Sequence, residues 1–146
     1  MTDAPFRSEA TERPEARSLF LGLMGAPYQS DWTTTFFRLL EETLARRCDV
    51  TVWTCGNATT ITSTLMHRDP DPIHPDSPSQ HCAHSLPTLA GRFLETYPDR
   101  LRWYVCRYCM EERGATHQMP GIEVKLPFSF DTYLHQAEQA LVLGIK

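Results

Sequence analysis

The chain has 146 residues, of which 41% are hydrophobic and 22% are charged, and its net charge is −4. This length predicts one domain with a core large enough to fold without a disulfide or a metal. The acidic balance and the lack of basic clusters argue against a nucleic-acid or membrane-surface partner, and the apolar runs are too short to cross a bilayer.

Residues 1–17 are polar, contain prolines and mix both signs of charge. They lack the apolar segment of a signal peptide, so we expect a disordered leader and a cytoplasmic protein whose thiols stay reduced. The five cysteines are an odd number, which also argues against a closed disulfide framework. We therefore expect the cysteines to be packed in the core, to bind a metal or to be reactive.

Strand-like and helix-like segments alternate along the rest of the chain. We expect strands over 18–25, 49–56, 100–106, 121–127 and 140–146, where the residues are apolar or β-branched. Helices are expected over 32–47, with Ser30 or Asp31 as N-cap, over 88–98, over 107–114, and over 130–139 with Ser129 as N-cap. This order predicts a single three-layer α/β domain over 18–146, with a five-stranded, mainly parallel sheet and helices on both faces.

A long loop interrupts the alternation. Residues 68–87 contain five prolines and the sequence HCAH, which holds Cys82 and His84. Loops of this length in a compact domain are usually functional or disordered.

Cysteines stand at the predicted carboxyl ends of two strands, where open α/β sheets bind their ligands. Cys55 ends the second strand, and Cys106 ends the third and begins a helix. Unpaired N–H groups at a helix start favour a thiolate, so Cys106 is the leading nucleophile. Cys109 lies one turn later, as a resolving thiol, a second metal ligand or a packed side chain.

Three other residues are expected to bind substrate. Tyr28 and Gln29 follow the first strand at the same edge, with ordinary loop residues as the alternative interpretation. Arg107 adds positive charge beside the cysteine that it follows.

The segment VCRYCMEERGA, residues 105–115, resembles the active-site segment of the DsrE/DsrF-like family of TusD/YchN-like sulfur-relay proteins. Cys106 takes the position of the family cysteine, and Arg113-Gly114 that of the Arg-Gly pair which ends the short helix. The resemblance extends over most of residues 18–146. It implies a persulfide carrier or sulfurtransferase that takes sulfur from a protein donor and passes it to an acceptor. It also implies a homo-oligomer, a trimer or hexamer, and no required cofactor.

A metal site is the alternative. Zinc takes four sulfur or nitrogen ligands in a tetrahedron. These would be Cys106, Cys109, Cys82 and one of His84 or His81 if the 68–87 loop folds back, with Cys55 as a further candidate. The protein would then be a zinc-binding or non-catalytic partner subunit of a complex.

Overall fold

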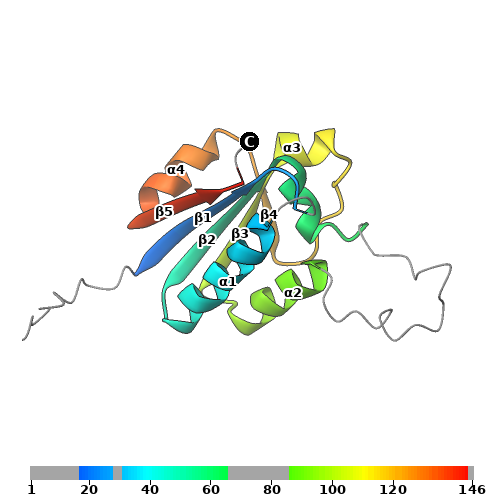
Figure 1. Cartoon of the computed structure of the whole chain (residues 1–146). Helices are drawn as coiled ribbons and strands as arrows, with labels where there is room; N and C mark the ends of the chain where they lie inside the picture. Colours follow the sequence, from blue (N-terminus) through cyan, green and yellow to red (C-terminus); the bar gives the residue numbers. More distant parts are fainter. Residues whose placement is uncertain (1–16, 28–30, 66–85, 145–146) are drawn as a thin grey trace, which may run out of the picture.

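The computed structural model describes residues 17–27, 31–65 and 86–144 (Figure 1). In chain order, its elements are β1 (Ser18–Met24), α1 (Trp32–Ala45), β2 (Asp49–Cys55), the 3₁₀ helix η1 (Gly56–Thr62), α2 (Leu86–Thr96), β3 (Leu101–Cys106), α3 (Arg107–Glu112), β4 (Ile122–Lys125), α4 (Ser129–Gln136) and β5 (Gln139–Leu143). The alternation predicted from the sequence is confirmed.

The strands form one sheet in the order β4-β3-β2-β1-β5. Every neighbouring pair is parallel, so the sheet is parallel throughout. All five carboxyl ends therefore meet at one edge. The register sets Met24 of β1 beside Cys55 of β2, which brings the ends of these two strands level.

Helices α1 and α2 cover one face of the sheet (Figure 1). The larger core lies here, and Phe36 and Leu40 of α1 pack with strand residues such as Val52 and Trp103. All four are fully buried. Because the larger cluster of buried residues lies here, this face holds most of the apolar burial. Each such side chain stabilises the fold by about 1.5–3 kcal/mol.

Helix α4 covers the opposite face, which confirms the three layers (Figure 1). Phe20, Trp53 and Tyr104 point to this side because side chains alternate along a strand. The ring of Phe130 in α4 meets Phe20 and Trp53 edge-on, with centroids 5.3 and 5.5 Å apart. No residue of α4 is fully buried, so this face of the sheet is covered less completely than the other.

Two predictions about helix starts need comment. Ser129 is not the N-cap of α4 but its first residue, because Phe128 already has helical dihedrals. The turn is closed earlier, by bonds from the Ser129 and Phe130 N–H groups to the carbonyls of Leu126 and Pro127. Asp31 does stand at the N-cap of α1, but its side chain makes no capping bond there.

Several predictions lie outside the described residues. These include the leader over 1–16, the residues 66–85 that contain most of the Pro/His-rich loop, and Ser30. Among the helices of the described part, none has the length and apolar character needed to cross a membrane.

Candidate functional site

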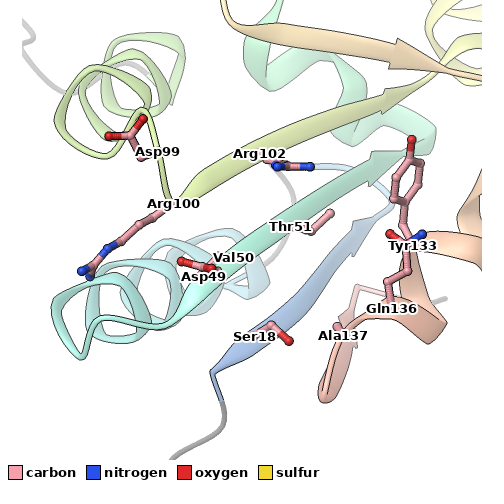
Figure 2. A pocket seen from close by; sticks show the side chains of 10 residues that line it. All are labelled: Ser18, Asp49, Val50, Thr51, Asp99, Arg100, Arg102, Tyr133, Gln136 and Ala137. Carbon is pink, nitrogen blue, oxygen red and sulfur yellow. The ribbon is translucent and has the colours of Figure 1, made fainter.

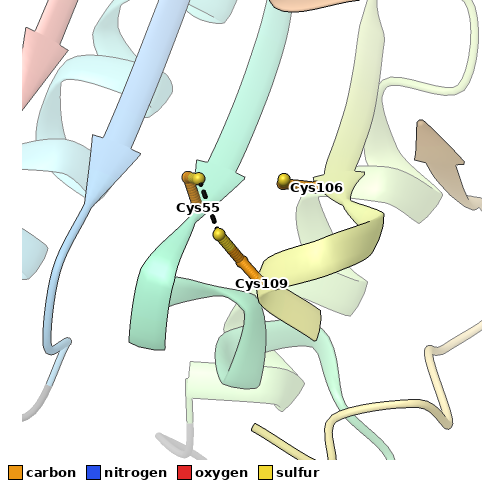
Figure 3. A group of neighbouring side chains, drawn as sticks. All are labelled: Cys55, Cys106 and Cys109. Carbon is orange, nitrogen blue, oxygen red and sulfur yellow. Dashed lines mark hydrogen bonds between the residues drawn. The ribbon is translucent and has the colours of Figure 1, made fainter. Parts of the chain in front are cut away.

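Three cysteines meet at the carboxyl edge of the sheet (Figure 3). Cys55 ends β2, Cys106 ends the neighbouring strand β3, and Cys109 lies in the first turn of α3. Their Sγ atoms all lie within 4.8 Å of one another. The Sγ atoms of Cys55 and Cys109 are only 3.0 Å apart, in a thiol–thiol hydrogen bond. We call these residues the cysteine cluster.

The three thiols differ in their access to solvent. Cys106 is 2% exposed and packs in the smaller core with Phe20, Trp53 and Tyr104. Cys55 and Cys109 are partly exposed. A molecule in solution therefore reaches the sulfur of Cys109 or Cys55 more easily than that of Cys106.

Burial also decides the ionisation of Cys106. It raises the pKa of this thiol and outweighs the favourable hydrogen bond from the backbone N–H of Cys109. The expectation that the helix start favours a Cys106 thiolate is therefore not met. Helix α3 has only six residues, so its dipole is small, while the thiol loses nearly all its contact with water.

Cys109 is the thiol that ionises first. Burial raises the pKa of Cys109, but hydrogen bonds from the Cys55 thiol, the Gly56 backbone N–H and the Cys106 thiol, together with the charge of Arg113, lower it further than burial raises it. Burial, and then the hydrogen bond to Cys109, raise the pKa of Cys55 to about 12. The Cys55 thiol thus stays protonated and donates a hydrogen bond to the Cys109 sulfur.

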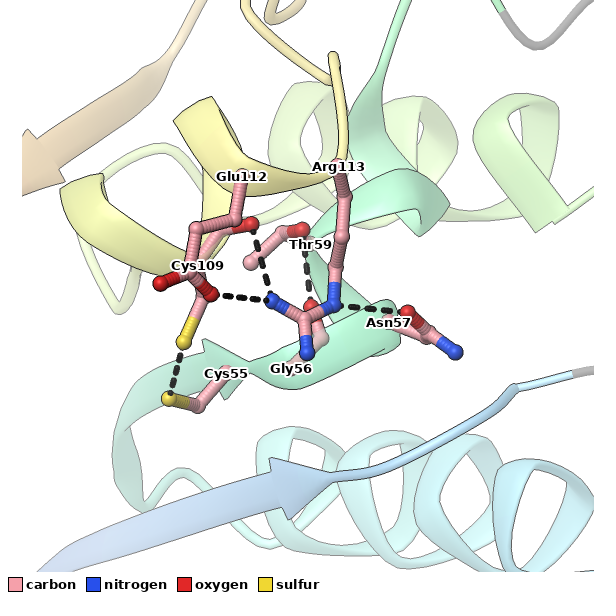
Figure 4. A network of polar contacts seen from close by, with 7 residues as sticks. All are labelled: Cys55, Gly56, Asn57, Thr59, Cys109, Glu112 and Arg113. Carbon is pink, nitrogen blue, oxygen red and sulfur yellow. Dashed lines mark hydrogen bonds and ion pairs between the residues drawn. The ribbon is translucent and has the colours of Figure 1, made fainter.

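Arg113 connects the two segments that carry Cys55 and Cys109 (Figure 4). Its Nε donates to Asn57 Oδ1 at 2.6 Å, and its Nη1 donates to the Cys109 carbonyl at 3.3 Å. Nη1 also forms an ion pair with Glu112 at 3.1 Å. Helix α3 is thereby fixed against η1, which begins directly after Cys55.

The predicted substrate-binding arginine has a different partner. Arg107 is exposed and its Nε lies 2.8 Å from Glu111 Oε1, so its charge is paired along the helix surface. Arg113 is the arginine whose charge acts on Cys109. The sequence marked it through the Arg113-Gly114 pair, although its contact with Asn57 carries no sequence signal.

The structure brings together only part of the predicted site. Cys106 and Cys109 adjoin, and Cys55 joins them. Tyr28, Gln29, Cys82 and His84 lie outside the described residues, so the proposed substrate and zinc contacts of these four stay predictions.

A polar hollow of about 190 Å³ lies elsewhere, beside α4 (Figure 2). Ser18 and Asp49 in its lining begin β1 and β2, which puts it at the amino ends of the strands. Arg102 and Tyr133 also line it. This hollow is at the opposite end of the sheet from the cysteine cluster, so the two are separate features.

The order of ionisation predicts a pH profile. Alkylation requires the thiolate, so the rate at Cys109 rises with pH through its lowered pKa and levels off below the pH at which an ordinary thiol does so. Replacing Cys55 by alanine removes a hydrogen-bond donor, which moves the profile to higher pH, whereas serine keeps a donor. Iodoacetamide labelling with peptide mapping measures both effects. Equal profiles for the wild type and Cys55→Ala would contradict the role of this hydrogen bond.

Of the comparisons with known proteins, the one with solved structures finds a similar protein. No family model matches the chain, and neither does any curated protein sequence. Among solved structures, the chain is similar to the YchN protein from E. coli, with a TM-score of 0.67 and 14% sequence identity. The match covers 87% of this chain and 99% of YchN. The DsrE-like fold that the segment 105–115 predicted is therefore confirmed, and this chain has that fold.

Proposed function

We propose that this protein is a cytoplasmic sulfur carrier that holds a sulfane sulfur as a persulfide, and that Cys109 is the cysteine that accepts it. One observation carries the proposal: Cys109 is partly exposed and its pKa is lowered within a cluster of three thiols. The family resemblance points to Cys106 for this role, but that thiol is 2% exposed and its pKa is raised. The geometry therefore favours the second cysteine of the pair.

The loading step needs no cofactor. The Cys109 thiolate attacks the outer sulfur of a donor persulfide, R–S–SH. A new bond forms between Cys109 Sγ and that sulfur, the old S–S bond breaks, and the donor leaves as the thiol R–SH. A lowered pKa raises the thiolate fraction and partial exposure gives access, and both raise the rate of such exchange.

In this proposal, Cys106 contributes only through its effect on Cys109. Its protonated thiol donates a hydrogen bond to Cys109, which lowers the pKa of Cys109. In this proposal, Cys106 is a positioning residue that stays in the apolar core with Trp53 and Tyr104.

Mass spectrometry tests the proposal directly. The reduced protein is incubated with an excess of a small-molecule persulfide, and its intact mass is taken. At early times, before any release of sulfide, we expect a gain of one sulfur atom in the wild type and in Cys106→Ser, and no gain in Cys109→Ser. Cys48→Ser is the matched control, because Cys48 is a buried cysteine before β2, outside the cluster. A gain retained in Cys109→Ser and lost in Cys106→Ser would return the role to Cys106.

A metal site is the second candidate function, because three sulfur ligand atoms lie within 4.8 Å of one another. Zinc in a tetrahedron of thiolates sets sulfurs about 3.8 Å apart, since each Zn–S bond is about 2.3 Å. The 3.0 Å contact between Cys55 and Cys109 is shorter than this, which favours thiol exchange over metal binding. Stoichiometric zinc in the purified protein, with no gain of sulfur, would establish the metal-binding function instead.

A carrier of this kind also needs partners. We propose a protein sulfur donor and acceptor, and a homo-oligomer, as the family resemblance implies. The exposed rings of Tyr108 and Phe128, whose centroids lie 6.3 Å apart, give an apolar surface beside the cysteine helix that suits a protein contact. Light scattering of the purified protein distinguishes a trimer or hexamer from a monomer.

A further inference from the structure

We infer that Cys55 is a resolving thiol, which attacks a persulfide on Cys109, releases its outer sulfur as hydrogen sulfide and leaves a Cys55–Cys109 disulfide. This inference rests on the proposed function and extends it. It makes the cluster a device that both holds a sulfur and discharges it as sulfide.

The distance between the two sulfurs carries the inference. Cys55 Sγ and Cys109 Sγ lie 3.0 Å apart, and a disulfide requires them to approach by about 1 Å more. The two residues are 54 positions apart in sequence, so this contact is made by the fold and not by helical spacing. Both thiols are partly exposed, which leaves a path for a small leaving group.

The surroundings hold the pair in this arrangement. Arg113 fixes α3 to Asn57, two residues after Cys55, and also bonds the carbonyl of Cys109. The Gly56 N–H is a further hydrogen-bond donor to the Cys109 sulfur. Such preorganisation favours a reaction within the pair over a reaction with a thiol from solution.

The step balances without an external oxidant. Cys55 Sγ attacks the inner sulfur, Cys109 Sγ, and a bond forms between them. The bond from Cys109 Sγ to the outer sulfur breaks, and the outer sulfur leaves with the electron pair as hydrosulfide. It takes up the proton that Cys55 releases, which gives hydrogen sulfide. The outer sulfur is reduced and the Cys55 sulfur is oxidised, while the Cys109 sulfur keeps the oxidation level that it has in the persulfide. A dithiol reductant then restores the cluster.

The charges in the cluster make this step depend on loading. With Cys109 free, burial and the hydrogen bond to the Cys109 sulfur raise the pKa of Cys55 to about 12, so Cys55 is protonated and unreactive. A persulfide on Cys109 moves the negative charge to the outer sulfur. The hydrogen bond and the repulsion that help to hold the Cys55 proton are then weakened, while burial still raises the pKa of Cys55. We therefore expect Cys55 to be a better nucleophile when Cys109 carries a sulfur than when it does not.

The experiment follows sulfide and mass together. Reduced protein is loaded with a small-molecule persulfide, excess donor is removed, and released hydrogen sulfide and intact mass are measured over time. The wild type is expected to release about one sulfide per chain and to end two hydrogen atoms lighter than the reduced protein, with peptides of Cys55 and Cys109 joined. Cys55→Ser is expected to load but to keep the added sulfur, with release slowed at least about tenfold.

Three controls separate the possible outcomes. Cys55→Ser keeps a hydroxyl donor beside Cys109 but cannot form a disulfide with it. Cys55→Ala removes both the hydrogen-bond donor and the attacking thiol. Cys48→Ser removes a cysteine outside the cluster. Release at the wild-type rate from Cys55→Ser, or a mapped Cys106–Cys109 disulfide in the wild type, overturns this inference and leaves the carrier function intact. Failure of the folded wild type to take up sulfur overturns both.

Discussion

Replacement of Trp103 by alanine is expected to lower the free energy of unfolding by about 3–5 kcal/mol. The Trp103 side chain is fully buried between the sheet and α1, with its ring 5.7 Å from that of Phe36. Its Nε1 also donates to Thr54 Oγ1 at 3.4 Å. Alanine leaves a large cavity and removes this donor, and urea denaturation followed by circular dichroism measures the loss.

The matched control is an apolar side chain at the surface. Leu65 is 59% exposed, so Leu65→Ala is expected to change stability by less than about 0.5 kcal/mol. Because Trp103 lies on the strand that ends at Cys106, its loss should also loosen the end of this strand and speed alkylation of Cys106. A loss below about 1 kcal/mol in Trp103→Ala would contradict the packing described for this face.

The second large effect is expected for Gly144→Ala, at the end of β5. A Cβ atom on Gly144 would lie 2.2 Å from the Met24 carbonyl oxygen, and the residue has a φ of +80°. The oxygen belongs to the backbone and cannot move aside cheaply. Left-handed backbone costs about 1–3 kcal/mol in a residue with a side chain, and the overlap adds a similar amount. Denaturation curves should therefore show a loss of at least about 2 kcal/mol.

Two other glycines separate the contributions. Gly114 also has a positive φ, of +66°, but nothing lies within 4 Å of its Cβ position, so Gly114→Ala should show the backbone cost alone. Gly91 lies within α2 with open space around it, and Gly91→Ala should stabilise the protein by about 0.5–1 kcal/mol. Equal losses for Gly114→Ala and Gly144→Ala would exclude the close approach of the two backbones as the cause.

The effect of Gly144→Ala should extend to the cysteine cluster. Met24 pairs in register with Cys55, so displacement of the end of β1 shifts the neighbouring end of β2. We expect the variant to form the Cys55–Cys109 disulfide more slowly, even where it remains folded.

The sequence alone determined the architecture. Short apolar segments that alternate with amphipathic ones predict parallel strands joined by helices, and the structure has them in that order. The same pattern placed Cys55 and Cys106 at the ends of two strands, hence at one edge of the sheet. Local patterns suffice here because the periodicity of side chains follows directly from helix and strand geometry.

The start of α4 shows where local patterns reach their limit. Ser129 has a side chain suited to capping, but the chain enters the helical turn one residue before it, with backbone bonds to Leu126 and Pro127. Propensity thus identified the helix and missed its first residue. Helix ends depend on the turn that leads into them as well as on the capping side chain.

Only the tertiary structure decided how the cysteines differ in exposure and in pKa. By sequence, Cys106 has the favoured position at a helix start, and Cys109 is its helper. In the fold, Cys106 is sealed in by aromatic side chains from neighbouring strands, while Cys109 receives a hydrogen bond from Cys55, 54 residues away. The pKa of a thiol is set by lost hydration and by nearby donors and charges, which belong to residues distant in sequence. These contacts exist only once the chain has folded, so the spacing of the two cysteines could not reveal which one ionises first.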